Sequence, residues 1–447
     1  MQPLPKEFEE QMKRLLGEAG FFAYLDALNQ PYTRALRVNL LLRPDGTPSC
    51  PIEGLGAPVP WAKGAYFVEG DARPGLSPLH EGGLFYMQEP SALTAVTALD
   101  PQPGERVLDL CAAPGGKSTQ IAALMAGRGL LCCNEPIPIR AQILSRNIER
   151  MGVRNAVVLS AMPDALAPRF PAFFDRILVD APCSGEGMFR RQPEARDEWD
   201  ADAPRRCADR QMEILAQAAK MLRPGGTMVY STCTFNDTEN EGVLKRFLAL
   251  HPEFSLVPFA LPGLPEAKDG YLHLYPHEMR GEGHFVSRLK KADAPVQAAP
   301  QRKAPARAAA KGKAPASIAL PDVFSDAFAP ERLYAAGDAL WMLPEGISIE
   351  RLSGLRVLRT GLLLAHAEGK RSEPDHALAM ALRPEEAART ASLTQTQALA
   401  YQAGETLSLG DLPGGYTLLC CEGVSLGWGK QAGGLMKNHY PKGLRRR

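Results

Sequence analysis

One short stretch, residues 109–118 (DLCAAPGGKS), constrains the fold more than any other part of the chain. An apolar, strand-like run (106–108, RVL) precedes it, and a helical run (119–125, TQIAALM) follows it. A strand, a turn of small residues and a helix N-terminus together place backbone N–H groups where they can face a polar or anionic ligand. The stretch therefore predicts a site for a nucleotide-like ligand.

Strand and helix patterns alternate on both sides of this stretch. Strand patterns fall at 106–110, 129–133, 156–159, 175–180 and 226–231, and helical patterns fall at 91–99, 117–126, 137–151 and 205–222. Such alternation predicts an α/β fold, a Rossmann-like, doubly wound parallel sheet whose ligands bind at the carboxyl ends of the strands. We expect four groups to meet there because they fall at predicted strand ends: Asp109, Glu135, Asp180 and 231–233.

The rest of the chain divides into further segments. Residues 1–85 carry a helical pattern and strand patterns at 35–41 and 61–68, which predict a small α+β domain before a sheet domain at 86–289. Residues 290–319 are rich in Ala, Pro, Lys and Arg and predict a basic linker. Globular composition resumes at 320–447, where strand patterns (355–358, 361–365, 416–421) predict an α+β or β-rich module.

Composition excludes several classes of protein. The net charge of the 447 residues is +1, so any basic surface is local. No apolar run approaches the roughly 20 residues of a membrane helix, and the N-terminus does not resemble a signal peptide. We therefore expect a cytoplasmic protein without membrane contact. The nine cysteines include no Cys-x-x-Cys pair, which predicts neither a metal site nor a disulfide framework.

Three ligands compete for the small-residue loop. The dinucleotide fingerprint Gly-x-Gly-x-x-Gly is absent. The sequence Gly116-Lys117-Ser118 matches the end of an ATPase P-loop, but Cys111 replaces the first glycine and Pro114 restricts the turn. The third ligand is S-adenosylmethionine, whose ribose needs a carboxylate at the end of the second strand, where Glu135 lies. A helix cap is the alternative role for Glu135.

Two cysteines follow strand ends in polar turns, Cys183 in 180–185 (DAPCSG) and Cys233 in 231–234 (STCT). A lone cysteine of this kind is usually structural, but two on neighbouring strands beside an acid favour chemistry. A thiolate that adds to carbon 6 of a pyrimidine makes carbon 5 nucleophilic enough to take a methyl group. A carboxyl group at N3 can stabilise the charge that develops, and a base must later remove the carbon 5 proton.

Several segments, taken together and in order, resemble a known family. They are 88–91 (QEPS), 109–118, 134–135 (NE), 180–187 (DAPCSGEG) and 231–240 (STCTFNDTEN), and they are similar to the Sun/Nop-type (RsmB/RsmF-like) RNA cytosine-5 methyltransferases. The resemblance implies methylation of cytosine carbon 5 in RNA with S-adenosylmethionine. It implies that Cys233 is the nucleophile and that Cys183 assists release of the methylated RNA. Asp180 would contact both the base and the cofactor, which is also held by Cys111, Ala112, Ala113, Pro114, Gly115, Gly116, Lys117 and Glu135.

The chain departs from the family pattern at one position. Met162 stands where the family usually has an acid near the adenine amino group, and Asp164 is the alternative contact from a shifted turn. The sequence does not decide between an acidic contact from Asp164 and backbone and apolar contacts.

The flanks also resemble the family. Residues 34–39 (RALRVN) are similar to its N-terminal RNA-handling domain, and 423–447 to a 16S ribosomal RNA subgroup with a C-terminal PUA-like RNA-binding module. Basic residues interleaved with aromatic ones suit contact with RNA, and here they are Lys430, Lys437, His439 and Lys442. We expect a monomeric enzyme acting on small-subunit ribosomal RNA. The alternatives are a tRNA cytosine-5 methyltransferase and a non-catalytic RNA-binding ribosome-assembly factor.

Overall fold

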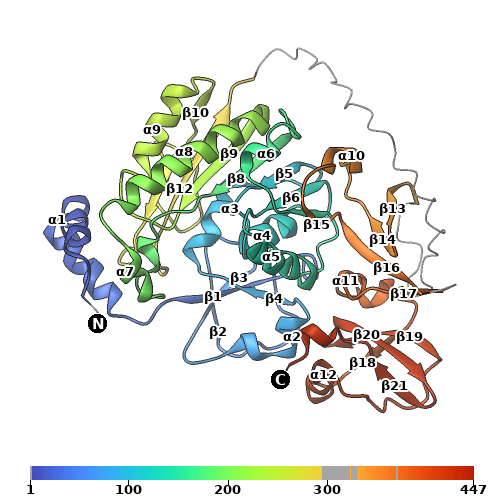
Figure 1. The fold of residues 1–447 in the computed structure, drawn as a ribbon. Coiled ribbons are helices and arrows are strands. Elements are labelled where there is room, and N and C mark those ends of the chain that lie inside the picture. The colour runs from blue at the N-terminus through green and yellow to red at the C-terminus, as the bar shows by residue number, and fades with distance from the viewer. Residues whose placement is uncertain (1–2, 294–322, 324–329, 369–370, 447) are drawn as a thin grey trace.

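The small-residue loop lies in the middle of a nine-stranded sheet. The computed structural model describes residues 3–293, 323, 330–368 and 371–446. The strand order of this sheet is β10-β12-β9-β8-β5-β6-β7-β15, with β11 paired to β12 (Figure 1). The loop follows β5 (Arg106–Asp109), which lies between β6 (Leu130–Asn134) and β8 (Phe174–Asp180). The chain order reverses at β5, and ligands bind at such switch points.

The core of the sheet is parallel, as the sequence predicts. β9 (Leu222–Thr232), β8, β5, β6 and β7 (Ala156–Leu159) run in one direction. Successive side chains face opposite sides, so Val107 and Leu108 pack in two different hydrophobic clusters. One cluster includes α3 (Thr94–Leu99), α4 (Gly116–Leu124) and α5 (Pro138–Arg150), and the other includes α6 (Pro163–Leu166), α8 (Ala203–Met221) and α9 (Glu241–Leu250).

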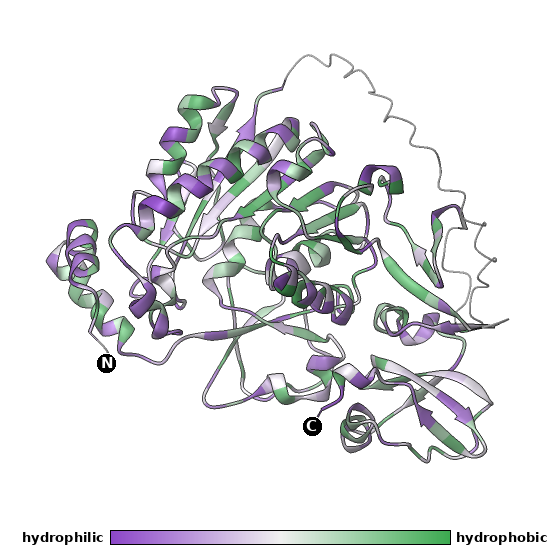
Figure 2. Cartoon of the chain, viewed as in Figure 1, coloured by the Kyte–Doolittle hydropathy of each residue, from purple (hydrophilic) through white to green (hydrophobic). Residues whose placement is uncertain are grey.

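Helices therefore cover both faces of the sheet, which confirms the doubly wound α/β fold. Figure 2 shows apolar central strands between helices whose outer faces are polar. The elements predicted for the central sheet domain agree with the structure within two residues, with two exceptions, while the strand predicted at 35–41 ends at Val38. The strand predicted at 226–231 extends over 222–232, and the helix predicted at 91–99 is a 3₁₀ turn (Ser91–Leu93) followed by α3.

Both edges of the sheet are antiparallel, which the strand–helix alternation did not predict. β12 (His284–Lys291) pairs with β9, and β10 (Phe254–Leu256) and β11 (Tyr271–Leu274) pair with β12. At the other edge, β15 (Val357–Arg359) pairs with β7. β15 comes from the predicted C-terminal module, so that region also contributes a strand to the central sheet.

The N-terminal region forms α1 (Lys6–Leu28) and a separate sheet of order β2-β3-β1-β4. Its strands are β1 (Arg34–Val38), β2 (Leu55–Pro58), β3 (Ala65–Val68) and β4 (Phe85–Met87), and α2 (Pro78–Glu81) precedes β4. The strand predicted at 61–68 begins only at Ala65. Trp61 lies in the preceding turn, where its indole N–H donates to the Pro90 carbonyl oxygen at 2.8 Å.

The C-terminal region is rich in β-structure, as predicted. One sheet joins β13 (Leu333–Ala336), β14 (Ala339–Met342), β16 (Leu362–Glu368) and β17 (Arg371–Pro374). A second joins β18 (Thr390–Ser392), β19 (Gly415–Cys421), β20 (Val424–Ala432) and β21 (Leu435–Asn438). The short helices are α7 (Glu194–Glu198) in the central domain and α10 (Ile349–Leu352), α11 (His376–Ala381) and α12 (Gln395–Ala403) here. Residues 294–319 of the predicted linker lie outside the described residues.

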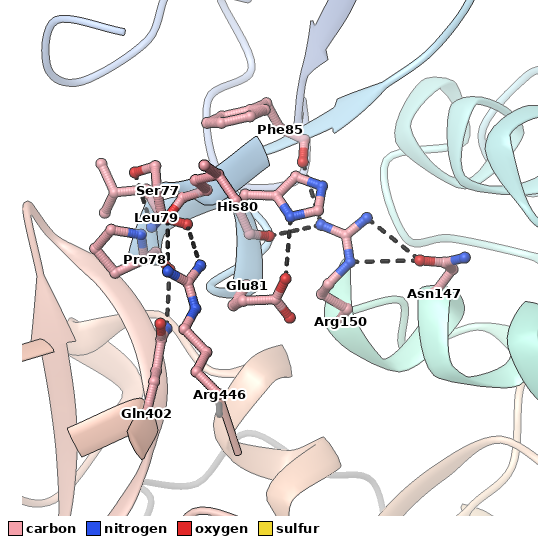
Figure 3. A network of polar contacts seen from close by, with 11 residues as sticks. Ser77, Pro78, Leu79, His80, Glu81, Phe85, Asn147, Arg150, Gln402 and Arg446 are labelled. Carbon is pink, nitrogen blue, oxygen red and sulfur yellow. Dashed lines mark hydrogen bonds and ion pairs between the residues drawn. The ribbon is translucent and has the colours of Figure 1, made fainter. Parts of the chain in front are cut away.

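The C-terminal region is docked onto α2 of the N-terminal region. The Gln402 side chain donates to the Pro78 carbonyl oxygen at 3.0 Å, and Arg446 donates to the Ser77 carbonyl oxygen at 3.0 Å (Figure 3). No helix of the described ranges is both long and apolar enough to cross a membrane.

Arg150 connects the same corner to the central sheet domain. Its guanidinium, at the end of α5, donates to the carbonyl oxygens of His80 at 2.6 Å and Phe85 at 3.3 Å (Figure 3). Side chains from two other parts of the chain thus satisfy backbone oxygens around α2, as partly buried carbonyls require. The corner therefore holds all three regions in one arrangement.

We predict that Arg150→Ala lowers the free energy of unfolding by about 1–3 kcal/mol, because it leaves two backbone oxygens without their charged donor. Urea denaturation followed by tryptophan fluorescence measures the change. Arg146→Ala, at an exposed position of the same helix, is the matched control. Equal midpoints for both variants would contradict the structural role of Arg150.

Candidate active site

The loop after β5 is shaped by its neighbours β6 and α5. The Ala112 N–H donates to the Asn134 carbonyl oxygen at 2.8 Å, and the Asn147 side chain donates to the Pro114 carbonyl oxygen at 2.8 Å. The Ala113–Pro114 peptide bond is cis. Gly115, the N-cap residue just before α4, has φ +115°, a conformation that favours glycine. The loop therefore has one defined shape at the switch point of the sheet.

Asp109 is buried beneath this loop. One carboxylate oxygen accepts a hydrogen bond from the Ser118 hydroxyl at 2.7 Å, and the other has no partner among the described residues. Burial raises the pKa of Asp109 to about 7. Burial also raises the pKa of Cys111 well above the ordinary value, so that this thiol is a poor nucleophile near neutral pH.

Lys117 and Asp180 form an ion pair between α4 and the end of β8. The Lys117 Nζ lies 2.7 Å from Asp180 Oδ2, while Oδ1 accepts the Ser231 hydroxyl at 2.8 Å and lies 3.5 Å from His284 Nε2. Burial alone would raise the pKa of Asp180, but Lys117 and His284 hold it well below its usual range. Burial would lower the pKa of Lys117, but Asp180 raises it. Both groups are therefore charged at neutral pH.

The two predicted cysteines are in direct contact. They follow β8 and β9, which pair so that Asp180 lies opposite Ser231, and their sulfur atoms are 3.3 Å apart. Both are free, half-buried thiols, since a disulfide bond would be about 2.05 Å long. The hydrogen bond with Cys233 and burial raise the pKa of Cys183 well above its ordinary value.

Two cavities meet at these thiols. The larger, of about 770 Å³, is lined by Glu135, Asp164, Cys183 and part of α8. The smaller, of about 270 Å³, is lined by residues 86–89, Lys117 and 282–284. Four residues border both cavities: Cys111, Ala113, Asp180 and Cys233. The larger cavity has the volume of a small-molecule site, and Cys233 can reach a group placed in the smaller one.

Glu135 lies just before α5 and does not cap it, since no side chain caps the start of this helix. One carboxylate oxygen accepts the Ile137 N–H at 3.0 Å, and the other lies 3.3 Å from Arg140. Its contact with a ribose stays a prediction. The carboxylate is nevertheless at the edge of the larger cavity. Met162 and Asp164 are both exposed and also line this cavity. Both therefore stay candidates for the contact with the adenine.

The predicted RNA-binding residues lie away from both cavities. Lys430 on β20 is opposite Lys437 on β21, and its amino group lies 4.7 Å from the centre of the Tyr416 ring. His439 Nδ1 is 3.0 Å from a carboxylate oxygen of Glu373, and Lys442 is exposed. Lys430 and Lys437 therefore lie side by side on neighbouring strands. Their contact with RNA stays a prediction.

Sequence reasoning missed three buried polar residues beside the thiols: Glu186, Glu239 and His284. Glu239 falls within the segment 231–240, but nothing in the sequence shows that its carboxylate is buried. Within the described ranges, no group of three or more His, Cys, Asp or Glu side chains could hold a metal ion.

The chain is similar to known proteins along its length. Residues 96–290 match the family 16S rRNA methyltransferase RsmB/F, 4–90 the N-terminal domain of 16S rRNA methyltransferase RsmF, 321–382 the RsmF rRNA methyltransferase first C-terminal domain, and 388–446 the methyltransferase RsmF PUA domain. Ribosomal RNA small subunit methyltransferase F of Erwinia tasmaniensis is 34% identical over 98% of this chain and 96% of its own length. The protein of the same name from an Enterobacter species is 35% identical over 98% and 95%. A methyltransferase homologue from Pyrococcus horikoshii, known from its crystal structure, is 30% identical, with a TM-score of 0.54 over 64% of this chain and 95% of that one.

We predict that Asp109→Asn becomes more stable relative to the wild type as the pH rises from about 4 to 7. The folded protein holds the proton of Asp109 above the pH at which the unfolded chain releases it, so ionisation removes stability across that interval. Urea denaturation at several pH values measures the difference. Asp269→Asn, at an exposed position, is the control, and a constant difference for Asp109→Asn would contradict the buried proton.

Proposed function

The chain belongs to the 16S rRNA methyltransferase RsmB/F family, and we propose that it transfers a methyl group from S-adenosylmethionine to carbon 5 of a cytosine in 16S ribosomal RNA. The observation that carries the proposal is the contact of two free thiols, 3.3 Å apart, beside the Lys117–Asp180 ion pair. Cys233 and Asp180 border both cavities, so one residue pair can serve a base on one side and a cofactor on the other.

The larger cavity, which Cys111 and Ala113 of the loop border, supports S-adenosylmethionine as its ligand. A buried carboxylate, Glu135, lies at the end of β6 where a ribose hydroxyl would be held. The loop 111–117 would hold the methionine part, and the turn 162–164 would hold the adenine. When bound, this cofactor supplies an electrophilic methyl group.

The thiol of Cys233 acts as the nucleophile in this proposal. The target base leaves its stack to enter the smaller cavity, and the thiolate adds to carbon 6. The electron pair of the C5–C6 double bond then makes carbon 5 nucleophilic. Asp180 accepts a hydrogen bond from the base, and its pairing with Lys117 places opposite charges where charge develops in the ring. Cys183 assists the departure of Cys233 after methylation.

The other predicted assignments belong to the same proposal. Residues 86–289 carry out methyl transfer, 1–85 and 320–447 handle RNA, and 290–319 link the two larger parts. The protein works as a monomer in the cytoplasm, where its RNA substrate is found.

Two alternatives have less support. A P-loop ATPase needs a lysine that is free to bind phosphate, but Lys117 is held by Asp180. A non-catalytic assembly factor would not need two thiols in contact. Methylation of tRNA by the same chemistry is distinguished by mapping 5-methylcytosine in both RNAs after deletion of the gene.

We predict opposite effects for the two cysteines. Cys233→Ala should abolish methyl transfer and any covalent adduct, because it removes the nucleophile. Cys183→Ala should leave an RNA–protein adduct that survives denaturing electrophoresis, because Cys233 departs much more slowly. Cys207→Ala, a half-buried thiol of α8 outside both cavities, is the control. An adduct formed by the Cys233 variant would overturn the assignment of roles.

We predict that replacing Lys430 and Lys437 together by Ala weakens RNA binding and reduces its salt dependence, because two phosphate contacts are lost. S-adenosylmethionine binding should not change. Point substitutions are preferable to removal of residues 430–447, since that segment includes β21 and the end of β20.

Filter binding at several salt concentrations measures the effect of the paired substitution. The control is Lys220→Ala with Lys245→Ala, two exposed lysines on α8 and α9. Equal losses of RNA affinity for both pairs would show that the β20–β21 surface has no special role.

A further inference from the structure

A buried carboxylate connects the two turns that carry the cysteines. Glu239, fully buried before α9, accepts the Ser184 N–H at 3.1 Å and the Asn236 side-chain amide at 2.8 Å. The Ser184 hydroxyl also donates to it. Ser184 follows Cys183 directly, and Asn236 is three residues after Cys233. One charged group therefore receives donors from both turns.

The other side of the Cys183 turn is tied to the same carboxylate through α8. The Gln211 amide donates to Glu239 at 2.8 Å and to the Pro182 carbonyl oxygen at 3.0 Å. The Tyr230 hydroxyl lies 2.9 Å from the Gln211 side-chain oxygen and 2.6 Å from the Glu239 carbonyl oxygen, two acceptors for its one proton. The residues before and after Cys183 are thus both bound, and its sulfur is directed at Cys233.

The donors around Glu239 match an ionised carboxylate. Four N–H or O–H groups converge on its two oxygens, from Ser184 (two), Asn236 and Gln211. A carboxyl group that accepts at both oxygens and donates no hydrogen bond is ionised. Burial raises the pKa of Glu239, and these hydrogen bonds oppose that rise. Its negative charge is one of the influences that raise the pKa of Cys183, after the hydrogen bond with Cys233 and burial. A nearby negative charge disfavours a second one.

We propose that Glu239 is a positioning residue that keeps Cys183 as the protonated member of the thiol pair, with its S–H group directed at the sulfur of Cys233. This inference rests on the proposed function and assigns the unequal roles of the two cysteines to a residue that touches neither RNA nor cofactor.

The consequence is greatest when the methylated base is released. The electron pair of the C5–H bond forms the C5–C6 double bond and the proton passes to water, while the electron pair of the C6–S bond stays on Cys233. The departing thiolate then accepts the hydrogen bond of the Cys183 thiol across 3.3 Å. A hydrogen bond to a charged group stabilises it more than one to a neutral group, so the thiol speeds the departure of Cys233.

A second buried carboxylate supplies a matched comparison. Glu186 is also fully buried and accepts the backbone N–H groups of Phe235 at 2.8 Å and Asn236 at 3.0 Å. It further accepts the Gln11 side chain from α1 at 2.9 Å and the Asn236 side-chain amide at 3.1 Å, a donor that it shares with Glu239. Glu186 therefore supports the Cys233 turn without holding the residues on either side of Cys183.

The test compares Glu239→Gln and Glu186→Gln in the full-length protein with target RNA and S-adenosylmethionine. In Glu239→Gln a neutral amide replaces the carboxylate. Its N–H groups face the donors that bind the carboxylate in the wild type, and the negative charge beside Cys183 is lost. We expect release of the methylated RNA from its adduct to slow by about 10- to 100-fold, the range of one hydrogen bond to a charged group. Cofactor binding should stay within about twofold. Glu186→Gln should lower the melting temperature without accumulating adduct.

The double variant Cys183→Ala with Glu239→Gln gives the decisive measurement. Because Glu239 acts through Cys183, the double variant should release RNA no more slowly than Cys183→Ala alone. The effects of substitutions at two coupled residues are not additive. Ser184→Ala, a milder change to the same contact, should slow release in the same direction. Slowing of release in the double variant by the product of the two single effects would overturn the proposal. Accumulation of adduct in both Glu239→Gln and Glu186→Gln would also overturn it. So would loss of both folding and cofactor binding in Glu239→Gln and Ser184→Ala. Absence of any adduct with Cys183→Ala would instead overturn the proposed function.

Discussion

The ion pair between Lys117 and Asp180 is the interaction on which the site depends. The Lys117 amino group, in the first turn of α4, lies 2.7 Å from the Asp180 carboxylate at the end of β8. The pair thus joins these two elements at the switch point of the sheet. An isolated buried charge would be costly, but here each charge has an opposite partner, and Asp180 also accepts the Ser231 hydroxyl. The Asp180 carboxylate of this pair borders both cavities, as do Cys111, Ala113 and Cys233.

Buried carboxylates organise the surroundings of this pair in different ways. Asp109 lies under the loop and retains a raised pKa because burial disfavours its charge. Glu239 and Glu186 collect backbone and side-chain donors from the two cysteine turns and act as cross-links between them. The shape of the site therefore depends also on buried acids that line neither cavity.

The flanking regions are joined to the central domain by specific contacts. β15 extends the central sheet from the C-terminal side, and Arg359 at its end pairs with Glu149 of α5. Around α2, Arg150 and Arg446 approach from different sides (Figure 3). The regions proposed to handle RNA are thus held at a defined orientation to the thiols, as a protein that must place one base in one cavity requires.

The sequence by itself determined the doubly wound sheet and the strand-end positions of Asp109, Glu135, Asp180 and Cys233, because hydrophobic periodicity and turn residues are local signals. It did not reveal β12 or β15 as edges of that sheet, since antiparallel pairing between distant segments leaves no local pattern. Nor did it show that Glu239 is buried or that Lys117 is held by Asp180. Only the tertiary structure decided these points, because burial and charge pairing depend on which distant side chains come within a few ångströms of each other.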